Sequence, residues 1–169
     1  MTLTTNDTRA ERHDPTESNP WVALVVFTVL VGAVSFVGNL ATSSGMDGWF
    51  QDLDKPSWQP PDSVFGPVWA GLYVLIIVAG WLVWRQVGIS KTLVPWVVQL
   101  ILNAGWSIVF FGLQSPNWAV VEIVLLAGAI VWTIVTFWPV HRVAALLLVP
   151  YLGWVGFATA LTLAIATMN

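Results

Sequence analysis

The chain has 169 residues, of which 57% are hydrophobic and 9% are charged, with a formal net charge of -3. Soluble globular domains carry about a quarter of charged residues, so this composition and a mean hydropathy of +0.77 exclude an ordinary soluble domain and indicate several membrane spans. The absence of cysteine excludes disulfides and thiolate chemistry. The net charge is weakly acidic, so the chain has no basic patch of the kind that binds nucleic acid.

Five apolar segments are long enough to cross the hydrocarbon core of a bilayer, which takes about 20 residues in a helix. We predict helices at about 21–41, 64–84, 92–113, 118–137 and 143–167. The predicted fold is therefore an all-α bundle of five transmembrane helices, forming one membrane domain over residues 20–169. Residues 1–19 are polar and lack the apolar segment of a cleavable signal, so we predict a disordered tail.

The first connection, residues 42–62, is long, whereas the other three are tight. Long connections in compact proteins are usually functional or disordered. The aromatic and proline residues of this one favour order, with a short interfacial helix near Trp49 to Leu53. Lys and Arg gather on the tail, the second loop and the fourth loop, and only Lys55 lies on the other side. This bias predicts a cytoplasmic N terminus, with the first loop and the C terminus outside.

The stretch from Lys55 to Tyr73 begins as a proline-stiffened loop and continues as an apolar helix. Its Phe65, Trp69 and Tyr73 recur every four residues, which places three rings on one helical face. Prolines on both sides of Trp58 restrict the backbone there. We therefore predict that the loop closes over a pocket and that the helix supplies one of its walls.

Other segments also have one face unsuited to lipid. Small and polar residues mark the buried faces of transmembrane helices, because lipid provides no hydrophobic drive between them. With the orientation above, these faces converge beneath the first loop. They carry Thr28, Gly32, Ser35 and Asn39 on the first segment, Asn103, Trp106, Ser107 and Phe110 on the third, and Tyr151, Trp154 and Ala158 on the fifth.

The twelve tryptophans divide by position. Trp69, Trp106 and Trp154 share faces with small or polar residues, which favours a cavity lined by rings. A large flat aromatic ligand would suit such walls, since ring contacts add about 0.5–1.5 kcal/mol each beyond burial, although smaller apolar ligands would use the same walls. Those near segment ends are expected to anchor at the membrane interface: Trp21, Trp81, Trp84, Trp96, Trp118 and Trp138.

For several residues the sequence allows both a structural and a functional interpretation. Glu122 is the only carboxylate inside a predicted segment, and a structural role near the interface stands slightly ahead of a functional one. Asn39 and Asn103 are equally explained as hydrogen bonds between helices or as ligand contacts. A ridge of small residues predicts close helix packing, either inside the bundle or between protomers: Gly156, Ala160 and Ala164.

Catalytic patterns are mostly missing from the sequence. His13 lies in the tail and His141 in a tight loop, so neither can serve in the bundle as a base or as an axial haem ligand. We find no glycine-rich phosphate loop, paired buried carboxylates, metal site or obligatory cofactor, and no repeated halves or charged relay of a transporter. A binding or sensing protein is favoured over an enzyme.

Three runs of residues carry a family resemblance: KPSWQPPDSVFGPVWAGLY, LNAGWSIVFF from Leu102, and PYLGWVGFATAL from Pro150. They resemble the tryptophan-rich sensory protein / translocator protein family (TspO/MBR), formerly the peripheral-type benzodiazepine receptors, over about Trp21 to Asn169. The resemblance implies a five-helix bundle in membrane lipid, often a homodimer. It further implies a pocket under the first loop that binds porphyrins such as protoporphyrin IX and haem, sterols and synthetic drugs.

The function implied is that of a membrane receptor or sensor that regulates or scavenges tetrapyrroles, with a porphyrin or other flat hydrophobic molecule as ligand. Transport of porphyrin or lipid and light- and oxygen-dependent porphyrin breakdown are the alternatives. For breakdown the candidate catalytic pair is Trp69 and Trp154, which we expect to face each other across the cavity. The expected ligand-binding residues are Asn39, Trp49, Phe50, Trp58, Phe65, Trp69, Tyr73, Asn103, Trp106, Phe110, Tyr151, Trp154 and Ala158.

The chain also departs from the family pattern. No Lys or Arg follows Tyr151, although the sterol motif of animal members needs one within a few positions. Phe50 stands where some relatives have tyrosine, so a hydroxyl contact is lost. The end, ALTLAIATMN, lacks an asparagine and an aromatic residue that relatives often carry, which predicts a less polar outer rim for the last helix.

Overall fold

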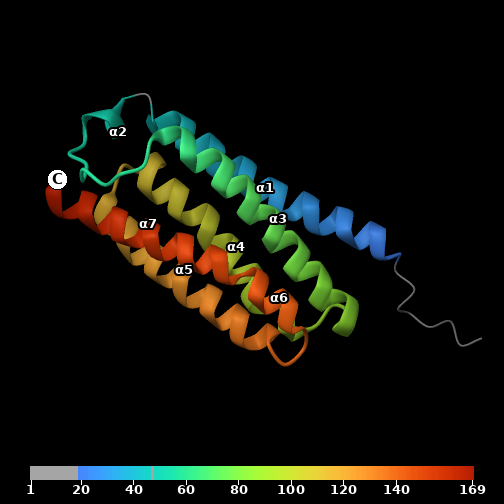
Figure 1. Cartoon of the computed structure of the whole chain (residues 1–169). Coiled ribbons are helices and arrows are strands. Elements are labelled where there is room, and N and C mark those ends of the chain that lie inside the picture. Colours follow the sequence, from blue (N-terminus) through green and yellow to red (C-terminus); the bar gives the residue numbers. More distant parts are fainter. Residues whose placement is uncertain (1–18, 47) are drawn as a thin grey trace, which may run out of the picture.

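The computed structural model describes residues 19–46 and 48–169 (Figure 1). The predicted disordered tail falls almost entirely outside the described residues. Within them all regular structure is helical, and five helices are long and apolar enough to cross a membrane. A helix satisfies its backbone hydrogen bonds within one segment, which hydrocarbon requires. The predicted all-α fold with five spanning helices is confirmed.

The described chain follows an alternating path through the bundle (Figure 1). The first two spans are α1 (Pro20–Met46) and α3 (Asp62–Val87), with the short α2 (Trp49–Asp52) between them where a short helix was predicted. The third is built from η1 (Lys91–Leu93), α4 (Val94–Ser107) and the π-helical turn η2 (Ile108–Gly112). The fourth is α5 (Pro116–Phe137), and the fifth joins α6 (Arg142–Leu147) to α7 (Val149–Met168).

The fifth span is divided at Leu148, where a single helix was predicted. Pro150 has no N–H group, so one carbonyl of the preceding turn loses its helical donor. At the break, the Leu148 N–H donates to the carbonyl of Ala145, three residues earlier instead of four, at 3.2 Å. The Leu152 N–H then bonds to the carbonyl of Leu148 at 2.9 Å, and α7 continues from there.

Trp96 corrects one expectation from the sequence. It was predicted to anchor at the membrane interface, yet its ring is 1% exposed in the centre of the bundle. Its indole N–H donates to the carbonyl of Ile76 on α3 at 3.0 Å, and its ring lies 5.0 Å from that of Phe27 on α1. Gly80 makes room for both rings, because a Cβ there would lie 2.6 Å from Trp96. This contact joins α1, α3 and α4.

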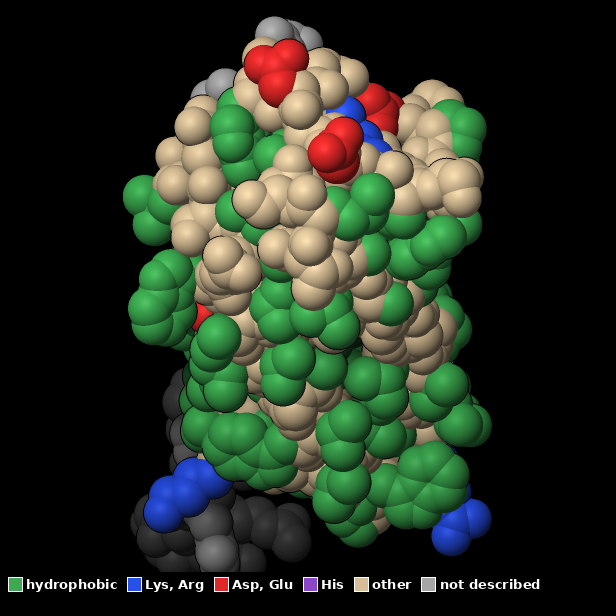
Figure 2. All heavy atoms as spheres, turned by 90° about the vertical axis from the view of Figure 1, so that its left-hand side faces the viewer, with side chains coloured by type: hydrophobic (Ala, Val, Ile, Leu, Met, Phe, Trp, Pro, Cys, Tyr) green, Lys and Arg blue, Asp and Glu red, His purple; other side chains and the backbone are tan. Residues whose placement is uncertain are grey.

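The surface is apolar between two charged ends. Figure 2 shows mainly acidic side chains, with a basic one among them, at the end that carries the first loop, basic side chains at the opposite end and mostly hydrophobic side chains between. The ridge residues Gly156 and Ala160 lie on this outer surface and Ala164 is half-buried, so the ridge is not part of the bundle core. The direction in which the bundle crosses the membrane remains the prediction made from the Lys and Arg bias.

Candidate functional site

A cavity of about 630 Å³ lies beneath the first loop, between α1, α3, the end of the third span and α7. Phe65, Trp69 and Tyr73 of α3 line it together, because residues four apart in a helix lie on the same face. The π-helical turn η2 presents Phe110 and the adjacent Phe111 together, and π-helical turns often occur at functional sites. The rings in the wall are Phe36, Phe50, Phe65, Trp69, Tyr73, Trp106, Phe110 and Phe111.

The cavity also has a few polar positions. Among the described residues that line it, Asp62, at the start of α3, is the only charged one. Two side chains of the loop region donate to its carboxylate, Gln51 at 3.5 Å and Gln59 at 3.4 Å. The other polar lining residues are Ser35, Asn39, Thr42, Ser107 and Thr162. The space is therefore apolar with a polar fringe, an arrangement typical of small-molecule sites.

The cavity reaches the outer surface between α1 and α3. Gly32 and Phe36 on α1 line it, and so do Gly66 and Ala70 on α3, and all four are also exposed. The two helices lie side by side (Figure 1). Because Gly32 and Gly66 carry no side chain, nothing closes the gap between the helices at these positions. A ligand dissolved in the bilayer could enter by this side.

The first loop is anchored over the cavity by α2. Phe50 is buried, with ring centroids 6.0 Å from Phe110 and 5.5 Å from Phe111. Trp49 contacts Phe110 edge-on at 5.7 Å, and the Lys55 ammonium lies 4.7 Å above the Phe50 ring. The short helix therefore packs on η2 through rings, and the loop forms the roof of the cavity.

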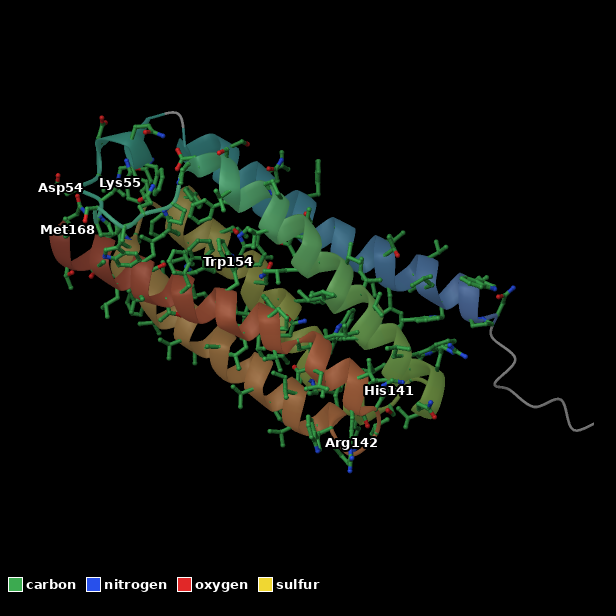
Figure 3. All side chains as sticks on the ribbon, viewed as in Figure 1. Asp54, Lys55, His141, Arg142, Trp154 and Met168 are labelled. Atoms are coloured by element: carbon green, nitrogen blue, oxygen red, sulfur yellow. The ribbon has the colours of Figure 1, made fainter. Side chains whose placement is uncertain are left out.

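A ladder of four rings closes the side between the loop, α3 and α7. Trp58 meets Phe157 edge-on at 5.9 Å, Phe157 meets Trp154 at 5.3 Å, and Trp154 meets Phe65 at 5.6 Å. Of these four rings only Phe65 also lines the cavity. Figure 3 shows Trp154 inside the bundle, beneath the loop. The ladder thus supports the wall from behind.

A second connection joins the loop to the end of α7. The Asn169 side chain accepts from the Asp54 N–H at 3.0 Å and donates to the Asp54 carbonyl at 3.1 Å and the Ile165 carbonyl at 2.9 Å. Figure 3 shows Asp54 beside Met168, at the same end of the bundle. Asn169 thus supplies a polar group at this end of α7 that holds the loop.

A chain of polar side chains runs from the cavity wall into the core. Ser35 on α1 interacts with the Tyr73 hydroxyl. Tyr73 donates to Asn103 Oδ1 at 3.0 Å, and Asn103 Nδ2 donates to the Tyr151 hydroxyl at 3.0 Å. Four helices each contribute one residue. Of the two interpretations of Asn103, the structure shows the hydrogen bonds between helices.

The expected ligand-binding residues fall into two groups. Those that line the cavity are Asn39, Phe50, Phe65, Trp69, Tyr73, Trp106, Phe110 and Ala158. Those that lie behind its wall are Trp49, Trp58, Asn103, Tyr151 and Trp154. The Trp69 ring neighbours Tyr73 at 5.5 Å and Tyr151 at 6.2 Å, whereas Trp154 contacts Phe65 and Phe157. The expected opposition of Trp69 and Trp154 across the cavity is not what the structure shows.

The sequence interpretation missed part of the lining. Phe36, Thr42, Gly66, Ala70, Phe111, Leu161 and Ile165 line the cavity without having been singled out. Of the stripe on the first segment, Gly32, Ser35 and Asn39 line the cavity, but Thr28 is exposed and bonds to the carbonyl of Leu24 at 2.8 Å. The missed positions are mostly small or aliphatic, and only the folded structure shows that they lie beside the cavity.

Glu122 does not belong to the cavity. It lies on α5, half-buried, against Gly105 on α4, where a Cβ would meet its Oε1 at 2.5 Å. This position fits the structural interpretation, in which a glycine makes room for the carboxyl group between two helices. In the described part of the chain, no group of three or more His, Asp or Glu residues could hold a metal ion.

Comparison with known proteins finds the same family by a family profile and by individual relatives. The profile of the TspO/MBR family matches residues 24–168. The chain is 40% identical to the translocator protein of Homo sapiens over 147 residues, covering 84% of this chain and 87% of the relative. It is 40% identical to the tryptophan-rich protein TspO of Archaeoglobus fulgidus over 149 residues, covering 86% and 96%. The same-named protein of Chlorobaculum tepidum is 43% identical over 141 residues, covering 81% and 89%.

These matches extend over nearly all the described helices, and five spanning helices with a long first loop are what the family resemblance implies. The chain belongs to the TspO/MBR family.

Proposed function

We propose that the cavity beneath the first loop binds a flat aromatic ligand of the tetrapyrrole class, and that the protein acts as a membrane receptor or sensor for it. The observation that carries this proposal is the wall itself, in which eight aromatic rings surround about 630 Å³. Ligand pockets typically enclose about 300–1,000 Å³. A planar conjugated ring system would gain stacked or edge-on contacts on several sides at once.

The shape of the polar fringe supports the same class. Protoporphyrin has a broad apolar ring system and carboxylate groups on one edge. Of the polar lining residues, Asn39 could donate a hydrogen bond from its amide to such a group, whereas the Thr42 hydroxyl already donates to the Gly38 carbonyl at 2.8 Å. The rings of Trp69 and Phe110 would cover the apolar face. The opening between α1 and α3 would admit a ligand that partitions into the bilayer.

Binding is favoured over the two alternatives. Among the described lining residues only Asp62 is charged, so the cavity lacks the charged relay expected of a transporter. Porphyrin breakdown by a tryptophan pair would require both rings to touch the ligand. Trp69 lines the cavity and Trp154 does not. Flux of protoporphyrin into sealed vesicles that contain the protein would instead favour transport.

The test is a titration of purified protein in lipid nanodiscs with protoporphyrin IX, followed by the absorbance of the porphyrin. We expect saturable binding at one site per chain. Trp69→Phe should weaken it by about three- to tenfold, since one ring contact is worth about 0.5–1.5 kcal/mol.

Trp118→Phe is the matched control, because Trp118 is 70% exposed on the outside of α5. It should leave the affinity unchanged. Absence of saturation, or equal weakening in the two variants, would contradict the proposed function.

A further inference from the structure

Of the four fully buried polar residues in the described part of the chain, Gln99 is the one whose side chain has no hydrogen-bond partner. It is 1% exposed on α4, and neither its side-chain oxygen nor its nitrogen has a hydrogen bond. The other three buried polar side chains are satisfied: Asn103 bonds to two tyrosines, and Thr133 and Thr162 bond to carbonyls of their own helices. Native proteins rarely leave such a group without a protein or water partner.

A second unused group belongs to the polar chain through Asn103, the next residue on the same face of α4. Gln99 and Asn103 are four residues apart, so they lie one turn apart on the same face of α4. The Tyr151 hydroxyl accepts from Asn103, but the proton of this hydroxyl has no acceptor among the described residues. Tyr151 is 0% exposed. The Gln99 amide, which can both donate and accept, therefore lies one helical turn from the amide that binds the Tyr151 phenol.

We propose that Gln99 and Tyr151 form a binding site for one internal water molecule. Water fits the chemistry, because it can accept the Tyr151 proton and donate to the Gln99 oxygen. Buried waters typically make about three hydrogen bonds to polar groups of this kind. The water would be the last member of the polar chain that begins at Ser35 and passes through Tyr73 and Asn103.

This site is separate from the cavity. Gln99, Asn103 and Tyr151 do not line it, and the Tyr73 ring stands between the cavity and the Asn103 amide. The water therefore does not depend on any ligand of the cavity. It would fix the position of the phenol that lies 6.2 Å behind the Trp69 ring, and so the back of the cavity wall.

The test uses the full chain in lipid bilayers, with nitrogen-15 in the glutamine side chains, and measures magnetisation transfer from water by NMR. The five glutamines give few signals, and Gln99→Met identifies the one from Gln99. We expect transfer to the Gln99 amide although the residue is buried, with the exposed Gln86 as the positive control. Transfer to Gln86 without transfer to Gln99 would overturn the proposal.

A second readout follows the tyrosines, of which the chain has two. With carbon-13 at the ring carbon that carries the hydroxyl, Gln99→Met should shift the Tyr151 signal, and Tyr73→Phe assigns the two signals. The control Gln86→Met should shift neither. An unchanged Tyr151 signal in folded Gln99→Met would also overturn the proposal, and if this variant fails to fold, the water transfer in the wild-type protein decides alone.

Discussion

Replacing Asn169 by alanine should loosen the first loop without changing the cavity wall. The Asn169 side chain makes two hydrogen bonds to Asp54, 115 residues earlier in the chain, and one to its own helix. Asn169 does not line the cavity. The substitution therefore removes a connection between the loop and α7 while the ring contacts of Phe50 and Trp58 remain.

The size of the effect follows from the two bonds that join loop and helix. A hydrogen bond contributes about 0.5–1.5 kcal/mol net, and both residues are exposed, so the lower end applies. Losing about 1 kcal/mol should raise the population of open loop about fivefold. Ligand association and dissociation should then accelerate together, with little change in affinity.

The chain has no cysteine, so spin labels can be attached to cysteines introduced at exposed Ser57 and Asn117. Asn169→Ala should increase the long-distance component of their distance distribution. Thr167→Ala is the matched control, because its hydroxyl bonds within α7 at 2.9 Å and does not hold the loop. Identical distributions in wild type and Asn169→Ala, or the same increase in Thr167→Ala, would refute the reasoning.

Two further predictions concern stability, measured by thermal unfolding in detergent. Asn103→Leu should lower the free energy of unfolding by about 1–3 kcal/mol, because hydrogen bonds between membrane helices average about 0.6 and reach about 1.7 kcal/mol each; an unchanged melting temperature would count against the polar chain. Gly80→Ala should cost about 1–3 kcal/mol by overpacking, since its Cβ would press on the buried Trp96. Gly71→Ala, on the same helix and in open space, should be neutral or stabilising by up to about 1 kcal/mol, and equal losses in the two glycine variants would contradict this.

Local spacing was enough to predict one wall of the cavity. Phe65, Trp69 and Tyr73 recur at intervals of four, a helix keeps such residues on one face, and all three line the cavity. Apolar length likewise predicted the five spans, because hydrocarbon forces each apolar segment to be a helix. These features depend on neighbours within one segment.

Other features depend on contacts between segments. The place of Trp96 near a segment end gave no sign that Gly80, sixteen residues earlier, leaves room for its ring. The hydrogen bonds of Asn169 connect it to a loop residue with no local signal in either stretch. The break at Leu148 could not be predicted from Pro150 alone, because a proline can either kink a helix or divide it.

The cavity was expected to have its walls on Lys55 to Tyr73 and on the segment around Trp154. The structure keeps the first wall and moves Trp154 behind it. Phe110 lines the cavity as expected, but it does so from a π-helical turn that also brings Phe111 to the wall. An inserted residue in a helix turn shifts every later side chain around the axis, and periodicity alone does not reveal where that happens.

The most direct test of the account is the affinity of protoporphyrin IX for Gly66→Leu. Gly66 lines the cavity at its opening between α1 and α3, and a Cβ there would meet nothing within 4 Å, so a leucine side chain would narrow the opening and the adjoining ligand space. Gly128→Leu on the exposed face of α5 adds the same side chain in equally open space away from the cavity. The account predicts at least about tenfold weaker binding, or about 1.4 kcal/mol, in Gly66→Leu and wild-type binding in Gly128→Leu; wild-type affinity in both would contradict it.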